Sequence, residues 1–429
     1  MTGWWMLAAL LAQGPLPPAS TPAGPRPGAP VVHGDLSVLA DVFPERDDAR
    51  ELRGRVRAEV TSEPAAWLRL RFEGIAEGLV ADRGGRVNAA HAEVREAWAD
   101  VRTGRMELRA GYGRIVWGRL DEVMPSDVIN PIDTAKFFLD GRAEARLPVA
   151  LVRSRVFLPA ETTLEAVVAL PGRRSRFDAL DEETSPFNLL TDVVLPAGVP
   201  VRAGIRRETP RASWRHVQTG VRLSTTAGRV DMSVSAWRGF EGFGQVSFET
   251  QLEPGPAGVA PTVIGELVER YPKFTMIAGD MEMVRGGWAI RGEVAGFVDK
   301  RLSGPMGPIE GKAFDAGVGV DRSAGDYHLF GSVIWHREWS PASSAGSRSH
   351  VNVIGSIDRR FSRDRYLARV FGVVNPEDRS GFVRGLFSWS VSDNVLLEAS
   401  AGLFPGEGTD TISRFTGRDF GFLRLKYHF

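Results

Sequence analysis

Residues 52–60 read Leu-Arg-Gly-Arg-Val-Arg-Ala-Glu-Val, and this stretch decides the fold. Every second residue is apolar or small, and the residues between them are Arg53, Arg55, Arg57 and Glu59. Successive side chains of a strand point to opposite faces, whereas a helix repeats about every 3.6 residues, so the alternation predicts a strand with one apolar and one charged face. The same alternation returns at 68–73, 288–294, 314–321 and 421–429.

The whole chain contains eighteen candidate strands of this kind. They lie near 34–43, 50–61, 66–78, 90–101, 105–117, 143–157, 162–170, 214–226, 229–239, 274–284, 287–297, 312–322, 327–337, 348–361, 365–374, 380–391, 394–404 and 418–429. Turn-forming pairs such as Thr103-Gly104 and Ala227-Gly228 mark short connections. Between them lie the longer connections 118–142, 171–213, 240–273 and 404–417. Short turns at one end, long loops at the other and a charged face opposite the apolar one are typical of an all-β fold, the transmembrane antiparallel up-and-down β-barrel. We therefore predict such a barrel with 16 to 18 strands, and 18 is the preferred count.

Composition excludes several other classes of protein. The 429 residues carry 53 Lys+Arg and 53 Asp+Glu, and this balance gives no basic surface for a dedicated nucleic-acid binder. There is no cysteine, so disulfides, thiolate metal sites and cysteine nucleophiles are excluded. No apolar run approaches the roughly 18 to 20 residues that a membrane-spanning helix needs.

The N-terminal 30 residues are predicted to lie outside the barrel. Residues 4–12 form an apolar stretch of the length found in secretory signals, which places a signal peptide at about 1–13, with cleavage after Ala12 or near Ala19. A buried N-terminal segment or a misassigned start is the alternative. Seven prolines within 14–30 indicate an extended tether, and the barrel takes up 31–429.

Tryptophan provides a second indication of a membrane. Nine tryptophans follow the signal, all near predicted strand ends, and indole favours the boundary between water and hydrocarbon. One belt is predicted to hold Trp67, Trp98, Trp288 and Trp389, and the other Trp117, Trp214, Trp237, Trp335 and Trp339. The alternative is that aromatic residues simply mark strand ends, as they do in any β protein.

Two stretches resemble known outer-membrane proteins. The final run, Phe422 to Phe429, is similar to the carboxy-terminal signal of Gram-negative outer-membrane barrels, whose last aromatic residue is read by the assembly machinery. Residues 109–121, followed by Asp127, Asn130-Pro131 and Asp133, resemble a poorly characterised group of porin-like barrels with a Gly-Arg-Gln…Trp-Gly…Asn-Pro-x-Asp pattern. The similarity continues through 164–171 and 291–293, and Tyr112-Gly113 replaces the Arg-Gln of the pattern. The resemblance implies a channel in the outer membrane of a Gram-negative cell and identifies no solute.

The segment 118–142 is the candidate constriction of the channel. It follows the fifth predicted strand, and in porins the loop at this position folds inward. By this analogy an acidic rim of Asp121, Glu122, Asp127 and Asp133 faces a basic ladder of Arg53, Arg55, Arg57, Arg69 and Arg71. Opposed rows of charge set up a transverse field that orients polar solutes.

Three plainer interpretations of these residues stay open. The charges pair across neighbouring strands and only line a water-filled wall. Pro125 and Pro131 serve only to shape the loop. Asp121, Asp127 and Asp133 bind calcium through their carboxylates, although their six-residue spacing matches no compact calcium loop.

The function that fits best is a porin-like channel for passive diffusion of small polar solutes. The seven histidines are scattered, and neither a zinc-type pair nor a Gly-x-Ser-x-Gly motif is present, so we expect no enzyme, no cofactor and no metal. The alternatives are an export pore for an acidic polysaccharide, an outer-membrane barrel enzyme and an adhesin. Expected partners are the lipid bilayer, the assembly machinery through Phe429, small polar solutes and a possible second copy of the chain, with no nucleic acid.

Overall fold

The computed structural model describes residues 28–46, 48–192, 200–253, 262–304, 307–340, 347–408 and 410–429. The predicted signal at 1–13 and the tether up to residue 27 therefore lie outside the described residues.

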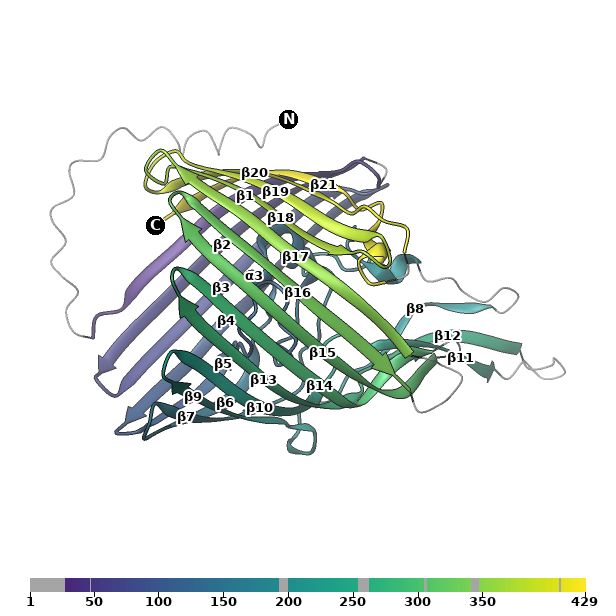
Figure 1. The fold of residues 1–429 in the computed structure, drawn as a ribbon. Helices are drawn as coiled ribbons and strands as arrows, with labels where there is room; N and C mark the ends of the chain where they lie inside the picture. Colours follow the sequence, from purple (N-terminus) through teal and green to yellow (C-terminus); the bar gives the residue numbers. More distant parts are fainter. Residues whose placement is uncertain are drawn as a thin grey trace.

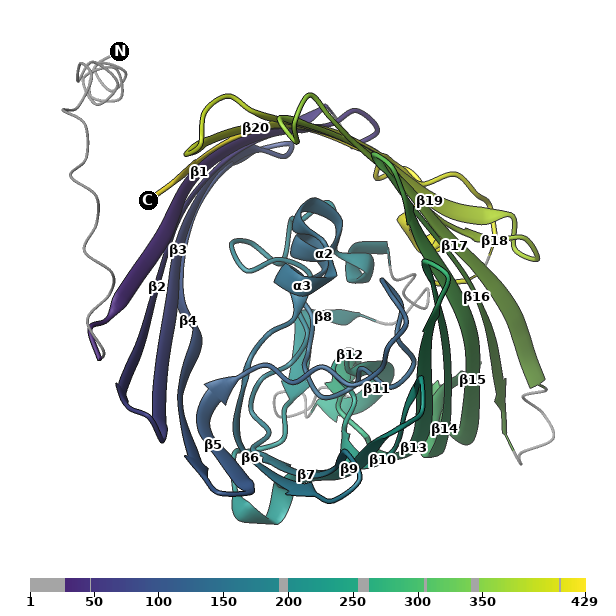
Figure 2. The same ribbon diagram turned by 60° about the vertical axis from the view of Figure 1, so that its left-hand side comes forward.

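Eighteen antiparallel strands form one closed sheet (Figures 1 and 2), which confirms the predicted barrel and the preferred count. They are β1 Val31–Phe43, β2 Ala49–Ala65, β3 Leu68–Asp82, β4 Arg86–Thr103, β5 Met106–Gly113, β6 Val149–Leu158, β7 Thr162–Ala169, β9 Gln218–Ala227, β10 Val230–Phe240, β13 Lys273–Arg285, β14 Trp288–Gly304, β15 Gly307–Ala324, β16 Tyr327–Trp339, β17 Ser347–Phe361, β18 Tyr366–Asn375, β19 Ser380–Ser390, β20 Val395–Leu403 and β21 Phe420–His428. Each predicted strand overlaps one of these. The first and last strands pair from Asp35 opposite His428 to Val42 opposite Gly421, so the barrel has no free edge.

The two ends of the barrel differ in their connections. At the end that we name the turn end, pairs such as β2–β3 and β4–β5 are joined by two to four residues. Both ends of the described chain lie there (Figure 1). At the opposite end, which we name the loop end, the longest connections leave the wall after β5, β7, β10 and β20. The predicted alternation of short and long connections is therefore correct.

The long connections contain elements that the alternation did not reveal. Strands β8 Val201–Glu208, β11 Gln245–Glu253 and β12 Thr262–Arg270 form a separate three-stranded sheet at the loop end (Figure 1). Short helical turns are η1 Leu189–Asp192, η2 Trp214–His216 and η3 Ser413–Phe415, and two helices, α2 Thr134–Asp140 and α3 Arg142–Ala145, follow β5. No helix within the described ranges is long and apolar enough to cross a membrane.

The predicted bounds of the fifth and sixth strands need correction. The fifth strand ends at Gly113 instead of residue 117, and the sixth begins at Val149 instead of residue 143. The chain leaves the wall after Gly113 because the backbone N–H of Ile115 bonds to the side-chain oxygen of Asn130 at 2.8 Å, inside the barrel. Alternation continues through 113–117, so the pattern alone gives no sign of this departure.

Apolar side chains of the strands face outward, as predicted. Leu52 and Val56 are exposed, while Arg53, Arg55 and Arg57 between them turn inward and bond to groups inside the barrel. The inner face is not purely polar, however. Two apolar clusters fill part of the barrel, one around Phe138, Phe187 and Phe382 and the other around Trp117 and Trp237.

Burial contradicts three of the nine predicted belt positions of tryptophan. Trp67, Trp214, Trp288, Trp335 and Trp339 are exposed, but Trp98, Trp117 and Trp237 are buried, so their assignment to a belt was wrong. The Trp117 ring makes an edge-to-face contact with Trp237, at 6.0 Å between centroids, and its indole N–H donates to Glu165 at 2.7 Å. A partner for the N–H inside the barrel removes the need for an interface position.

The outward apolar face gives a first testable prediction. Val318 of β15 is 60 % exposed. Val318→Arg is expected to lower the free energy of unfolding in lipid vesicles by about 2–4 kcal/mol, because a guanidinium at mid-bilayer depth loses its hydration. Leu252→Arg is the matched control, since Leu252 is 70 % exposed but belongs to the small sheet beyond the barrel. Urea unfolding measures both, and equal effects of the two substitutions would contradict an outward face in contact with lipid.

Candidate pore constriction

The segment 114–148 lies inside the barrel, and its helices α2 and α3 sit within the ring of strands (Figure 2). Asp133 caps α2 by accepting a hydrogen bond from the backbone N–H of Lys136 at 3.1 Å. Gly141 ends the helix with φ +94°, a conformation that glycine adopts without strain. An antiparallel bridge between Ile132 and Arg146 closes the base of the excursion. We name residues 114–148 the plug.

One wall of the barrel anchors the start of the plug through Glu293 of β14. This carboxylate is 2 % exposed and accepts hydrogen bonds from the backbone N–H groups of Arg119, at 3.0 Å, and Ser126, at 2.6 Å. It also accepts from the N–H of Leu120 and from the Ser126 hydroxyl. A Cβ on Gly118, whose φ is +97°, would lie 2.8 Å from both carboxylate oxygens, so only glycine permits this approach.

The opposite wall holds the helices of the plug by ion pairs. Asp140, at the end of α2, lies 2.7 Å from Arg55 and 2.6 Å from Arg424, measured between oxygen and nitrogen. Glu144 of α3 pairs with Arg57 and with Arg95, at 3.2 Å each. Arg53 pairs with Asp178, which belongs to the connection after β7, at 2.8 Å. Three residues of the predicted ladder thus contact acids inside the barrel.

The two remaining ladder residues lie elsewhere. Arg69 is near the turn end, is half exposed and, among the described residues, pairs with Glu63 alone. Arg71 pairs with Glu59, Glu73 and Glu96 of the wall strands, which is the arrangement of a charge that lines the wall.

The four predicted acids belong to the plug or its base, and each has its own arginine partner. Asp121 pairs with Arg291 at 2.6 Å and Glu122 with Arg369 at 3.1 Å, both on the wall of β14 to β18. Asp127 pairs within the plug with Arg142 and Arg146. Asp133 pairs with Arg176 at 2.7 Å, and its burial raises the pKa of its carboxyl although Arg176 offsets part of the rise.

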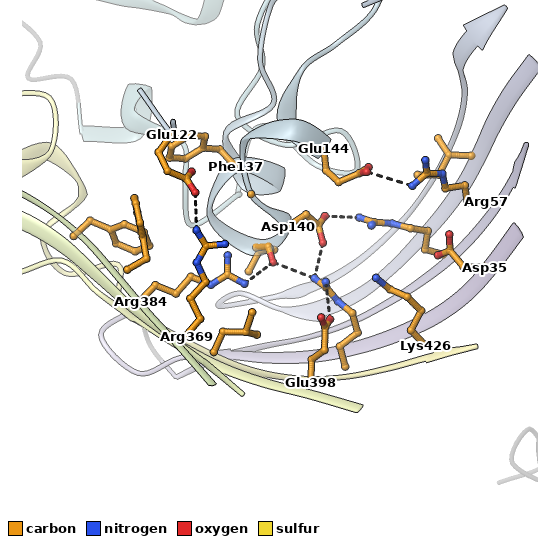
Figure 3. A pocket seen from close by; sticks show the side chains of 18 residues that line it. Asp35, Arg57, Glu122, Phe137, Asp140, Glu144, Arg369, Arg384, Glu398 and Lys426 are labelled. Atoms are coloured by element: carbon orange, nitrogen blue, oxygen red, sulfur yellow. Dashed lines mark hydrogen bonds and ion pairs between the residues drawn. The ribbon is translucent and has the colours of Figure 1, made fainter. Parts of the chain in front are cut away.

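A polar cavity of about 200 Å³ remains between α2 and the wall (Figure 3). We name it the polar chamber. Its lining comes from the plug and from strands β1 to β3 and β18 to β21. Six cations and five carboxylates line it, namely Arg55, Arg57, Arg369, Arg384, Arg424 and Lys426 with Asp35, Glu122, Asp140, Glu144 and Glu398.

Two of these cations have no carboxylate partner within the part of the chain that the structure describes. Arg384 donates to the backbone oxygen of Leu139 at 3.1 Å and to the Ser400 hydroxyl at 2.9 Å, both neutral acceptors. Lys426 also makes no ion pair with a described residue. The other four cations share the plug and wall acids, and the lining Asp35 makes no ion pair with a described residue either. With six cations against five carboxylates, the lining keeps an excess of one positive charge that a dissolved anion can meet.

The Asp140 cluster gives a prediction that combines substitution with pH. Burial alone would raise the pKa of the Asp140 carboxyl, but Arg55 and Arg424 hold it well below its usual range. Asp140→Asn is expected to raise the anion-to-cation permeability ratio about threefold, because two guanidinium groups lose their shared countercharge. Because its pKa is lowered, the Asp140 carboxyl stays ionised even below its ordinary pKa of about 4. Acidification from pH 8 to pH 5 should therefore not reproduce the effect of the substitution.

Reversal potentials across a salt gradient measure both parts of this prediction. Asp326→Asn is the matched control, since Asp326 is exposed in a turn at the turn end. A wild-type chain that becomes as anion-selective at pH 5 as the Asp140→Asn variant at pH 8 would contradict the depressed pKa.

A metal site and a catalytic histidine each require a particular arrangement of side chains. The described ranges contain no group of three or more His, Cys, Asp or Glu residues placed to hold a metal ion. The Ser213 hydroxyl lies 2.9 Å from Nδ1 of His216, but His216 forms no ion pair with a described carboxylate. The pair therefore lacks the third group that orients a catalytic histidine.

Sequence reasoning missed Asp140, Glu144, Asp178 and Arg384. A signal for the first two was present, because Asp133 and Gly141 bracket a seven-residue stretch with the cap residues of a short helix. Asp178 and Arg384 carried no signal, since nothing in the spacing of a long loop or of a strand tells which wall charge meets which loop charge.

The quoted stretches that resemble porin-like barrels meet in space. Trp117 bonds to Glu165, Arg119 to Glu293, and Asn130 joins the N–H of Ile115 to the backbone oxygen of Leu147. These residues therefore build the entry and the base of the plug.

Comparison with known proteins finds similarity in structure only. No family model matches the chain, and no curated protein matches it. Acinetobacter baumannii OccAB2 is similar with a TM-score of 0.52 at 8% sequence identity, over 93% of this chain and 98% of that one. Pseudomonas aeruginosa OpdK, solved with vanillate, has a TM-score of 0.51 at 11% identity, over 93% and 98% of the two chains. The chain has the barrel fold of outer-membrane porins.

Proposed function

We propose that this protein is a porin-like channel of a Gram-negative outer membrane through which small polar solutes diffuse. The polar chamber carries the proposal, because it is a space lined by charged side chains between the plug and the wall of a closed barrel. Its volume of about 200 Å³ compares with roughly 30 Å³ for one water in the liquid, so the solutes are small.

The constriction in this proposal consists of the ladder residues Arg53, Arg55 and Arg57 and their acidic partners inside the barrel. Asp121 and Glu122 hold the other side of the plug through Arg291 and Arg369. Opposed fixed charges across a narrow passage favour polar solutes and disfavour apolar ones. Arg384 and Lys426 add a preference for small anions, since neither forms an ion pair with a described carboxylate.

Location and assembly belong to the same proposal. The outward apolar face matches the lipid bilayer, and residues 1–13 are the export signal. Phe429 lies at the turn end beside Gly34, where the two residues exchange backbone hydrogen bonds of 3.0 Å. We propose that this terminal aromatic residue is the contact that the barrel-assembly machinery reads.

Planar-bilayer recordings of the purified chain test the proposal. We expect small ohmic conductance with a preference for chloride over potassium, and reduction of the current by millimolar sugars or small organic anions. Block by anionic oligosaccharides but not by monosaccharides would favour polysaccharide export instead. Absence of conductance from folded, inserted protein would overturn the channel.

A further inference from the structure

A second cavity, of about 450 Å³, lies on the loop-end side of α2 and is mostly apolar. We name it the apolar chamber. Phenylalanines from five separate parts of the chain line it, namely Phe137, Phe138, Phe177, Phe243, Phe382, Phe404 and Phe415. The two chambers share Phe137 and Phe382, which therefore stand between the apolar space and the polar one.

Three phenylalanines of this wall pack edge-to-face against Phe138. Its ring centroid lies 5.0 Å from that of Phe382 and 4.9 Å from those of Phe404 and Phe415, all in edge-to-face geometry. The quadrupole of an aromatic ring favours this geometry, and the same rings can offer their faces and edges to a further ring.

Two of the three charged side chains that line this chamber already have an ion-pair partner. Arg142 is paired with Asp127, and Glu269 is paired with Arg207. Arg414 is exposed, and its guanidinium donates to the backbone oxygen of Leu189 at 3.4 Å. The chamber therefore offers apolar contact over most of its wall and few groups that could hold water in place.

The chamber is open to solvent on one side, where the lining residues Thr411 and Arg414 are exposed. A molecule can therefore enter it from outside. A cavity of about 150 Å³ lined by apolar side chains is enough to bind benzene. A chamber of about 450 Å³ therefore has room for a body of two rings.

We propose that the apolar chamber is a binding site for a compact aromatic molecule of about two rings, which enters from the loop end. This proposal specifies a solute for the proposed channel and rests on that channel for the path beyond the site. A molecule bound in the apolar chamber faces the polar chamber across Phe137 and Phe382. The channel then takes solutes that combine an aromatic body with a small polar group.

Titration calorimetry with 2-naphthol as the probe tests the site in detergent-solubilised, full-length protein. We expect saturable binding of one molecule per chain and no binding of glucose. Thr411→Trp, at an exposed position that lines the chamber, adds an indole to the space and should weaken binding at least about tenfold. Leu190→Trp fills the chamber from another segment and should act likewise.

Thr416→Trp is the matched control, since Thr416 is exposed on the same connection and does not line the chamber. It should keep the wild-type affinity and so correct for partition of the probe into micelles. Equal heats from the wild type and both filling variants would overturn the aromatic site. Because calorimetry does not depend on conductance, failure of this site and failure of the channel are distinguishable.

Discussion

Replacement of Thr134–Glu144 by Asn-Gly is expected to raise the single-channel conductance about threefold or more. This change removes α2 and most of α3, the part of the plug that fills the middle of the barrel. The base of the excursion is already a two-stranded bridge, because Ile132 pairs with Arg146 and the N–H of Asp133 donates to the backbone oxygen of Ala145. A two-residue hairpin turn therefore fits the gap.

Loss of the helices also changes the charge of the passage. Arg55 and Arg424 lose Asp140, and Arg57 and Arg95 lose Glu144, while all four guanidinium groups stay on the wall. The widened passage should therefore become strongly selective for anions. Planar-bilayer recording in asymmetric salt measures conductance and selectivity together.

A control places the same dipeptide at an exposed site outside the barrel, where Asn-Gly replaces Arg211-Ala212. That variant should conduct like the wild type. A plug deletion that folds and inserts but keeps the wild-type conductance would show that α2 and α3 do not limit the passage.

Glu293→Ala is expected to speed hydrogen exchange at residues 118–127 about 100-fold, which corresponds to ~2.7 kcal/mol of local opening. The substitution leaves the N–H groups of Arg119, Leu120 and Ser126 and the Ser126 hydroxyl without their acceptor. Buried donors without partners cost free energy, so the start of the plug should detach from β14 and the open-channel current should become noisier.

Exchange measured by mass spectrometry on peptides that cover 118–127 checks this expectation. Glu63→Ala, at a mostly exposed residue near the turn end, is the control and should leave these peptides protected. Unchanged protection of 118–127 in folded Glu293→Ala would mean that other contacts hold the plug.

The barrel wall was predictable because one physical requirement repeats along every strand. In Leu52 to Val60, each position must suit either lipid or the enclosed space, and a period of two follows directly from strand geometry. The short turns are predictable for a similar local reason, since residues such as Gly104, with φ +53°, are needed where the chain reverses.

The interior was less predictable because its contacts join residues far apart in the chain. Arg53, Arg55 and Arg57 could be placed on the inward face, but their partners Asp178, Asp140 and Glu144 follow from how the loops fold. The apolar clusters show the same limit. Phe382 shares the inward face of its strand with Arg384, but the alternation does not tell that a phenylalanine of the plug packs against it.

Thiol labelling in lipid vesicles tests the central claim most directly, namely that alternate side chains face lipid and enclosed water. The natural chain has no cysteine, so each introduced cysteine is its only thiol. Lys426 and Arg369 line the polar chamber, while their neighbours Leu425 and Val370 are outward and exposed. Each of these four residues is replaced by cysteine in a separate variant. A small water-soluble thiol reagent should label positions 426 and 369 and spare 425 and 370, whereas a lipid-soluble maleimide should show the reverse preference. Equal labelling of both members of each pair by the water-soluble reagent would contradict the account.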